Sequence, residues 1–129
     1  MYPEEFLYTQ DHEWIRVDGN TASVGITDHA QKELGDIVFV ELPQVGAHLT
    51  AKESFGTVES VKAVADIYSP VTGEVIAVNP KIQNAPELVN SDPHGEGWLI
   101  QLELKDRSET DRLMSAEEYE AYLKGGATH

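Results

Sequence analysis

The feature that most constrains the fold of this 129-residue sequence is a series of short segments rich in β-forming residues and separated by turns. Residues 14–17 and 22–26 flank a turn at 18–20, and this arrangement predicts a β-hairpin. Further strands are predicted at 37–42, where the apolar run looks buried, at three places between residues 55 and 78, and at 97–104. The sequence therefore predicts a mainly β fold.

A short helix near residues 28–34 interrupts the series of strands. Thr27 suits an N-cap, because its hydroxyl can accept a hydrogen bond from a free N–H of the first turn, and Gly35 suits the C-terminal stop. Residues 79–96 are rich in Pro, Asn and Gly and are predicted to form a long loop. Long loops often carry function, which makes this segment a candidate functional surface.

The sequence is predicted to end in a helix near residues 115–124. Ser115 and Glu118 have the spacing of a capping box, and the Gly pair at 125–126 is expected to end the helix. No linker of altered composition divides the chain, so one domain over residues 1–129 is expected.

The charge balance excludes several classes of function. Nine Lys and Arg residues against 23 Asp and Glu residues give a formal net charge of −14. Such a surface repels the phosphates of nucleic acids and anionic lipids, so neither nucleic acid nor a membrane is expected as a partner. The same charge favours docking to basic patches on other proteins.

Residue types that are absent narrow the chemistry further. The chain has no cysteine, which excludes disulfides, thiolate catalysis and cysteine-ligated metals, so any redox chemistry must come from a cofactor. Its five histidines show no paired ligand spacing, and no metal site is predicted. No apolar run reaches membrane-spanning length and the first residues lack a secretory signal, so a cytoplasmic protein is expected.

Lys62 is the main candidate functional residue. It is the only basic residue between Lys52 and Lys81, and it lies at the predicted tip of a hairpin, close in sequence to Glu59 and Asp66. A single amine held out on a turn suits covalent attachment of another group. From the residues alone the alternative stays open that Lys62 is an ordinary exposed lysine, paired with those acids for at most about 1 kcal/mol.

The hairpin around this lysine has a definite predicted register. With residues 61–62 at the centre of the turn, Glu59 pairs with Val64, and Glu59, Asp66 and Phe55 share the outer face. Neither central residue tolerates positive φ well. A type I turn or a slightly longer loop is therefore expected rather than a primed two-residue turn.

Several ordered segments resemble those of a known family. Residues 59–63 (Glu-Ser-Val-Lys-Ala) followed by 69–75 (Ser-Pro-Val-Thr-Gly-Glu-Val) resemble the lipoate-attachment motif. Other segments are similar to the H proteins of the glycine cleavage system, namely 11–14, 25–31, 34–35, 38–43, 89–91 and 97–98. The sequence is identified as a member of that family from about residue 8 to residue 122.

The resemblance implies a barrel-sandwich hybrid fold of the lipoyl-domain type, with lipoate in amide linkage to Lys62. It implies a monomeric carrier rather than an enzyme. The implied partners are the pyridoxal-phosphate glycine decarboxylase (P protein), the tetrahydrofolate-dependent aminomethyltransferase (T protein) and the flavoprotein dihydrolipoamide dehydrogenase (L protein). A lipoate-attaching enzyme is implied as well.

The resemblance also implies roles for individual residues. Glu59 and Gly73 would be recognised by the lipoate-attaching enzyme. Glu13, Asp66 and Asp11 would belong to a cleft that holds the cationic aminomethyl group on the arm. Relatives can have a hydroxyl residue at the position of Asp11, where this sequence has a second acid.

The same residues also allow rival functions. Ser60 and Lys62 could form a serine–lysine dyad of a hydrolase, but no oxyanion loop is evident. Biotin carriers flank their lysine with methionines, whereas the neighbours here are Val61 and Ala63. A lipoyl domain of a 2-oxoacid dehydrogenase is shorter and lacks the His-Glu-Trp segment. A related carrier that donates lipoate to other lipoyl-dependent enzymes remains an alternative.

Overall fold

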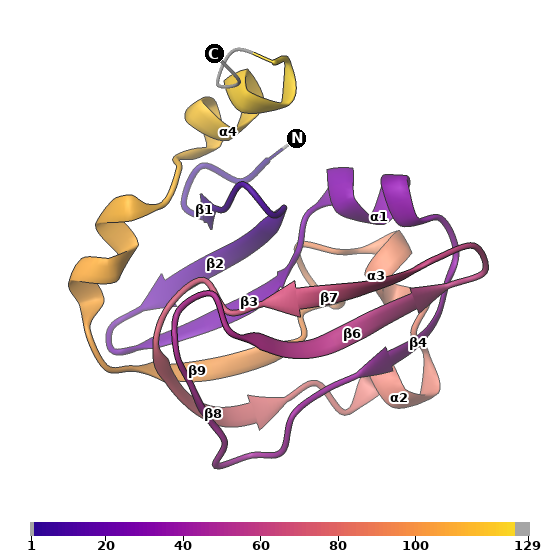
Figure 1. The fold of residues 1–129 in the computed structure, drawn as a ribbon, viewed down its shortest axis with the longest axis horizontal. Coiled ribbons are helices and arrows are strands. Elements are labelled where there is room, and N and C mark those ends of the chain that lie inside the picture. The colour runs from indigo at the N-terminus through magenta and orange to yellow at the C-terminus, as the bar shows by residue number, and fades with distance from the viewer. Residues whose placement is uncertain (1, 126–129) are drawn as a thin grey trace.

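The computed structural model describes residues 2–125, and its framework is two antiparallel β-sheets (Figure 1). One sheet has six strands in the order β1-β2-β3-β9-β8-β5, and the other has three in the order β4-β6-β7. The strands are β1 (Leu7–Tyr8), β2 (Glu13–Asp18), β3 (Thr21–Ile26), β4 (Ile37–Glu41), β5 (His48–Leu49), β6 (Ser54–Ser60), β7 (Val64–Tyr68), β8 (Gly73–Val78) and β9 (Ile100–Leu104). The helices are α1 (Asp28–Leu34), α2 (Lys81–Asn84), α3 (Leu88–Ser91), the 3-10 helix η1 (Arg107–Arg112) and α4 (Ala116–Leu123).

This arrangement confirms the mainly β prediction. The first hairpin is formed by β2 and β3, with Asp18 opposite Thr21 at its turn. The three strands predicted between residues 55 and 78 are β6, β7 and β8. The last strand begins only at Ile100, because Gly97 and Trp98 still belong to the preceding turn. No helix among the described residues is long and apolar enough to cross a membrane.

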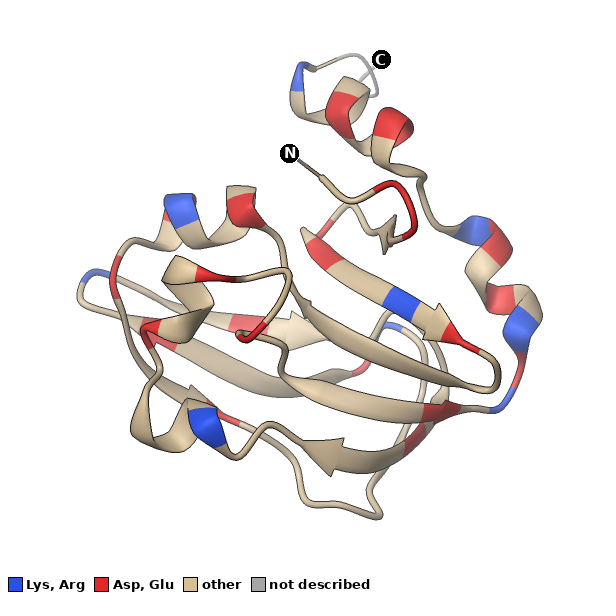
Figure 2. Cartoon of the chain, turned by 180° about the vertical axis from the view of Figure 1, so that it is seen from behind, with Lys and Arg blue, Asp and Glu red and all other residues tan. Residues whose placement is uncertain are grey.

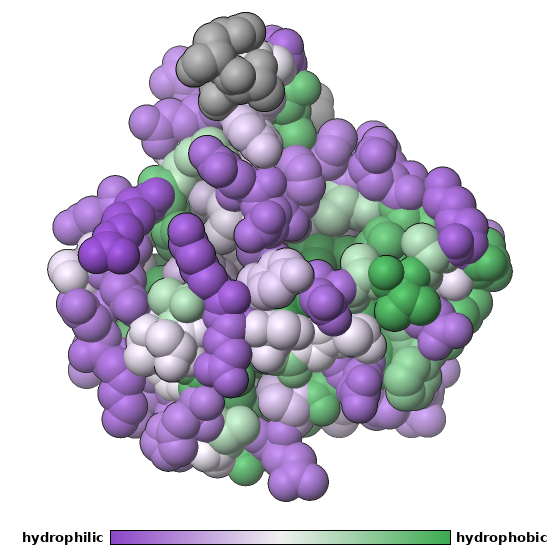
Figure 3. All heavy atoms as spheres, viewed as in Figure 1, coloured by the Kyte–Doolittle hydropathy of each residue, from purple (hydrophilic) through white to green (hydrophobic). Residues whose placement is uncertain are grey.

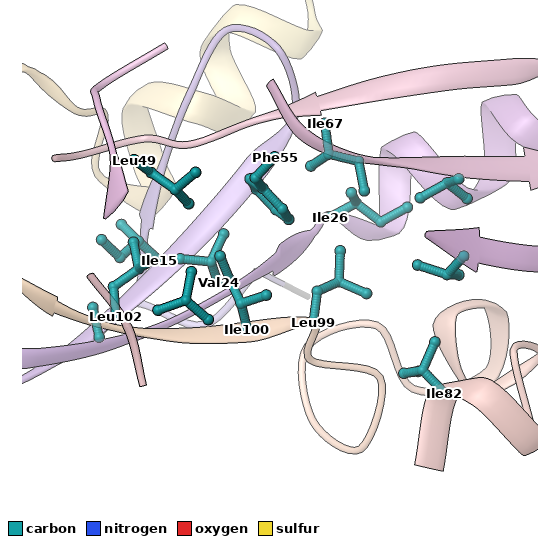
Figure 4. Packing of buried hydrophobic residues seen from close by; sticks show 14 of the residues in the cluster. Ile15, Val24, Ile26, Leu49, Phe55, Ile67, Ile82, Leu99, Ile100 and Leu102 are labelled. Atoms are coloured by element: carbon teal, nitrogen blue, oxygen red, sulfur yellow. The ribbon is translucent and has the colours of Figure 1, made fainter. Parts of the chain in front are cut away.

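The core lies between the two sheets. Figure 4 shows Phe55 and Ile67 of the three-stranded sheet pointing toward Val24, Ile26 and Ile100 of the six-stranded sheet. All five side chains are at most 6% exposed. Full burial of such a side chain stabilises the fold by about 1.5–3 kcal/mol, so these contacts hold the sheets together.

A β-bulge corrects the predicted position of Phe55, which is buried rather than on the outer face. Ser54 lies opposite Tyr68 and Gly56 opposite Ile67, so two steps along β6 match one step along β7. The extra residue shifts the alternation of the strand, and Phe55 turns into the core.

A second bulge corrects the prediction that 37–42 is a buried strand. Ile37 and Val40 are 4% and 2% exposed, but Val38 and Phe39 are 49% and 50% exposed. The pairing of β4 with β6 shifts between Ile37 and Phe39. Two neighbouring apolar side chains therefore face solvent together, which a regular strand would not allow.

Helix α1 confirms the predicted helix at 28–34. The Thr27 hydroxyl accepts a hydrogen bond of 3.2 Å from the Ala30 N–H. Gly35 follows with φ of +83°, in the left-handed region that glycine enters at no steric cost, and its N–H donates to the Gln31 carbonyl.

The prediction of a long loop at 79–96 is wrong, since α2 and α3 lie within it. Each has four residues, which is too short for a helical hydrophobic pattern to show in the sequence. Asn90 of α3 joins this segment to its surroundings. Its side chain accepts a hydrogen bond from the Ile37 N–H and donates one to the Gly35 carbonyl.

Helix α4 confirms the predicted C-terminal helix and its capping box. The Ser115 hydroxyl accepts from the Glu118 N–H, and the Glu118 carboxylate accepts from the Ser115 N–H. Tyr119 is fully buried and stacks on Tyr8 with ring centroids 4.8 Å apart. Gly125 follows the helix with φ of +90°, and its predicted partner Gly126 lies outside the described residues.

Candidate functional site

Lys62 lies at the tip of the β6–β7 hairpin, which extends beyond the body of the sheets in Figure 1. The predicted register is confirmed, with Glu59 opposite Val64 and Thr57 opposite Asp66. The lysine is exposed. Among the described residues the ion pairs are Lys32 with Asp28 and Lys81 with Glu96, so Lys62 is not held by either nearby acid. Figure 2 shows how few basic segments accompany the acidic ones.

The turn that presents Lys62 is held by the buried side chain of Ser60. Its Oγ accepts hydrogen bonds from the N–H groups of Lys62 and Ala63, at 3.3 and 3.0 Å. The Val61 N–H donates to the Asp36 carbonyl at 3.1 Å, which ties the tip to the segment before β4. No residue between Ser60 and Ala63 has positive φ, as the sequence predicted.

The same geometry argues against a serine–lysine hydrolase. Ser60 is 5% exposed, and its hydroxyl also donates a hydrogen bond of 3.2 Å to the Ala63 carbonyl. A nucleophile needs a free lone pair aimed at substrate and a base within hydrogen-bond reach. Here the hydroxyl is engaged with the backbone of its own turn, so the role of Ser60 is structural.

A cavity of about 520 Å³ lies near the other end of the hairpin. Glu13 and Asp11 both line this cavity, and Asp66 does not. Its walls come from the β1–β2 turn, the segments around residues 51 and 69, and η1 with the residues after it. Tyr68, the last residue of β7, lines the cavity too. At a rise of about 3.3 Å per residue along a β-strand, Tyr68 lies about 20 Å from Lys62.

Glu13 is a buried carboxylate with two defined hydrogen bonds. It is 2% exposed, the Thr9 hydroxyl donates to its Oε1 at 2.7 Å, and the Tyr68 N–H donates to its Oε2 at 3.1 Å. Burial raises the pKa of Glu13 to about 7, since the loss of water outweighs both hydrogen bonds. Each oxygen keeps a lone pair, so the ionised group can still accept from a cationic donor in the cavity.

The structure brings Glu13 and Asp11 together and places Asp66 apart from them. Asp66 is exposed on the outer face of the hairpin, partway along β7 between Lys62 and the cavity. Glu59 is exposed on the same face, nearer the tip.

Gly73 is buried at the start of β8, where two strands approach closely. A Cβ at this position would lie 2.5 Å from the carbonyl oxygen of Glu103 on β9. The glycine is thus required by packing. Its recognition by an attaching enzyme stays a prediction.

Sequence reasoning missed the groups that support Glu13. Thr9 is four residues before it, but Tyr68 is 55 residues away and only the fold brings its N–H to the carboxylate. Two basic residues, Lys52 and Arg112, also line the cavity and were not predicted. No local pattern would have indicated them, because they reach the cavity from separate segments. Among the described residues, no group of three His, Asp or Glu could hold a metal ion.

Comparisons with known proteins agree on one family. The family model described as glycine cleavage H-protein matches residues 6–126. The glycine cleavage system H protein of Anoxybacillus flavithermus is 58% identical over 121 residues, covering 94% of this chain and 95% of that one. A probable glycine cleavage system H protein of Haloarcula marismortui is 56% identical over 117 residues, covering 91% and 92%.

A solved structure gives the same result for the fold. The crystal structure of a glycine cleavage system H protein from Mycobacterium marinum superposes with a TM-score of 0.87 and 39% sequence identity. The match covers 96% of this chain and 99% of that one. The expected sandwich of two sheets with short helices is thereby confirmed.

Proposed function

The chain belongs to the glycine cleavage H-protein family, and from that premise we propose that Lys62 carries its lipoyl group. Members of the family are lipoyl-bearing shuttles of the glycine cleavage system, and this chain is such a carrier, without catalytic activity of its own. The observation that carries the assignment to Lys62 is its presentation. The amine is exposed at the tip of a hairpin of defined register, and no acid in the described part of the chain forms an ion pair with it.

The residues around the tip fit a covalently bound arm. Acylation needs an amine that an enzyme can reach, and Lys62 is exposed. Its stem passes Gly35 at the end of α1, where an added Cβ would lie 3.4 Å from Lys62 Cε, an ordinary contact distance. When bound, the lipoyl group supplies a disulfide that accepts the aminomethyl group and is left as a dithiol after the one-carbon unit is released.

For the cationic cargo we propose Glu13 and Asp11 as the acids of the cleft, with Asp66 on the path toward it. Supporting this, Glu13 and Asp11 line one cavity, and Glu13 is fixed by Thr9 and Tyr68 with lone pairs to spare. An ammonium accepted by a positioned carboxylate forms a charge-assisted hydrogen bond, worth roughly 1.5–3 kcal/mol. Such a bond would keep the cargo out of water until it is transferred.

As part of the glycine cleavage system, the chain works with the P, T and L proteins. We propose further that a lipoate-attaching enzyme modifies it, that it acts as a monomer and as one domain over residues 1–129, and that it works in the cytoplasm. The family match over residues 6–126 supports the single domain, and the bacterial origin of relatives such as the Anoxybacillus flavithermus protein supports the compartment.

Intact mass followed by peptide mapping of protein isolated from a lipoate-sufficient host tests the proposal. Lipoylation adds about 188 Da, and the proposal expects this increment on the peptide that contains Lys62. An increment on another lysine, or none in a host that lipoylates other carriers, would reject it.

A further inference from the structure

Exposed apolar side chains gather around Lys62. The large apolar residues that the described part of the chain leaves exposed are Val38, Phe39, Val45, Val61, Val64 and Ile76. Four of them belong to β4 or to the tip of the β6–β7 hairpin, and we call these four, Val38, Phe39, Val61 and Val64, the tip patch. Figure 3 shows hydrophobic surface gathered on the side of the molecule where this hairpin ends.

Strand register places Phe39 and Val64 of the tip patch on one face of the three-stranded sheet. Phe39 lies opposite Glu59, and Glu59 lies opposite Val64, so the three side chains form a row across the three-stranded sheet. Since neighbouring strands are about 4.8 Å apart, Phe39 and Val64 stand about 10 Å from each other on either side of the Glu59 carboxylate. The bulge in β4 adds Val38 beside Phe39.

Carboxylates lie within and beside this apolar surface. Glu59 stands within the row, and the next row along the same face holds Glu41, Thr57 and Asp66 in neighbouring positions. Both acids of that second row are exposed. An apolar surface enclosed by polar residues is typical of a protein-binding site, and acids of one sign call for a basic partner surface.

The patch is also rigid. The Val61 N–H is bonded to the Asp36 carbonyl, and the Ser60 hydroxyl closes the turn beneath Lys62. A surface held in one conformation by hydrogen bonds loses less conformational entropy on association than a flexible one, which favours affinity.

We propose that the tip patch is the docking surface for the enzyme that attaches lipoate to Lys62, and that this enzyme meets it with an apolar side chain flanked by Lys or Arg. The inference rests on the proposed function, because it takes Lys62 as the attachment residue. The partner's apolar surface contacts Phe39 and Val64, and its basic groups meet Glu41, Glu59 and Asp66.

Distance distinguishes this partner from the others. In attachment, the neutral Lys62 amine attacks the carbonyl carbon of lipoyl-AMP. The C–N bond forms, the bond from carbon to the AMP oxygen breaks, AMP leaves with the electron pair, and the nitrogen releases one proton. The enzyme must therefore contact the surface next to a bare lysine side chain. Enzymes that use the finished arm meet its far end and have no such need.

The test uses the full chain in its unmodified form with a purified lipoate–protein ligase, lipoate and ATP, and mass spectrometry measures initial rates. Phe39→Ser and Val64→Thr should each lower kcat/KM for attachment about tenfold through a higher KM, as expected for truncation at the centre of an interface. The matched control is Ile76→Thr, which removes an exposed apolar group from β8, in the other sheet. It should react like the wild type.

The outcomes separate this inference from the proposed function. If the wild type gains no lipoyl group on Lys62, the proposed function fails. If the wild type is modified there and both tip-patch variants, with unchanged circular dichroism and thermal midpoint, are modified at its rate, the inference fails alone. The inference also expects that the tip-patch variants, once fully lipoylated, support glycine cleavage with the P, T and L proteins at the wild-type rate. A defect at that stage with normal attachment would assign the patch to one of those enzymes and overturn the inference.

Discussion

The backbone N–H of Tyr68 donates a hydrogen bond of 3.1 Å to Oε2 of Glu13. Tyr68 is the last residue of β7, and β7 begins two residues after Lys62. One strand thus runs from the exposed lysine to a buried carboxylate in the cavity. The sites proposed for attachment and for the cargo are joined by a single hydrogen-bonded element, which sets the distance that the proposed arm must cover.

Lys62→Arg should keep the fold and abolish carrier activity. The side chain is exposed and makes no ion pair with the nearby acids, so its replacement breaks no ion pair and buries no new charge. A guanidinium cannot become the lipoyl amide. Intact mass should show no lipoyl increment, and glycine cleavage with the other three proteins should stop. A variant that is still lipoylated and active would contradict the assignment.

Ser60→Ala should destabilise the hairpin tip by about 1 kcal/mol. The change removes the acceptor for the N–H groups of Lys62 and Ala63 from a buried position. Denaturant unfolding would measure the loss, with Ser54→Ala at an exposed position as the control.

The wild type should also fail to react with a fluorophosphonate probe, since the Ser60 hydroxyl is hydrogen-bonded within its own turn. Labelling at Ser60 would revive the hydrolase hypothesis.

The hairpin was predictable from sequence because its information is local. The alternation of side chains defines the register, and the structure has that register. Positive φ is unfavourable for Val61 and Lys62, which defines the kind of turn, and neither residue has positive φ in the structure. The bulges that expose Val38 and bury Phe55 were not predictable, because packing between the sheets decides where an extra residue is absorbed.

The site was predictable only in part, for the same physical reason. The acids of the cleft came from family resemblance, and resemblance says nothing of how Glu13 is held. Its burial depends on Tyr68, which is distant in sequence, and the basic residues Lys52 and Arg112 reach the cavity from other segments. From charge alone, Lys62 could have formed an ion pair with Glu59 or Asp66. The structure shows neither ion pair.

Gly73→Ala should destabilise the protein by about 1–3 kcal/mol, because the new Cβ would lie 2.5 Å from the Glu103 carbonyl oxygen. Thermal unfolding measures this effect. Lipoylation rates, corrected for the folded fraction, then test the predicted recognition role. A rate equal to that of the wild type would show that packing is the whole reason for the glycine, whereas a lower rate would support recognition.

Glu13 should make stability depend on pH. Its pKa is raised to about 7 in the folded protein, so the folded state binds the proton more tightly than the unfolded chain. This contribution to the free energy of unfolding is fully present below the unfolded pKa, near 4.5, and is lost as the pH rises through 7. The slope in that window is at most about 1.4 kcal/mol per pH unit.

Glu13→Gln removes that titration, so its free energy of unfolding should fall less between pH 4.5 and 7 than that of the wild type. Urea unfolding at several pH values measures the difference. Glu103→Gln, which removes an exposed carboxyl of β9, controls for the loss of one charge. Parallel curves for the wild type and Glu13→Gln would contradict the buried-proton account.

Glu13→Gln should also speed the loss of the aminomethyl cargo from the loaded carrier. An amide cannot balance the charge of an ammonium, and a charge-assisted hydrogen bond of roughly 1.5–3 kcal/mol corresponds to a change of about 10- to 100-fold in the rate of loss. Release of formaldehyde from carrier loaded by the P protein with glycine measures this rate. In the wild type, protection should weaken as the pH falls below about 7 and Glu13 takes up its proton. The Glu103→Gln control should retain its cargo like the wild type, and equal rates for all three proteins would reject the role of Glu13.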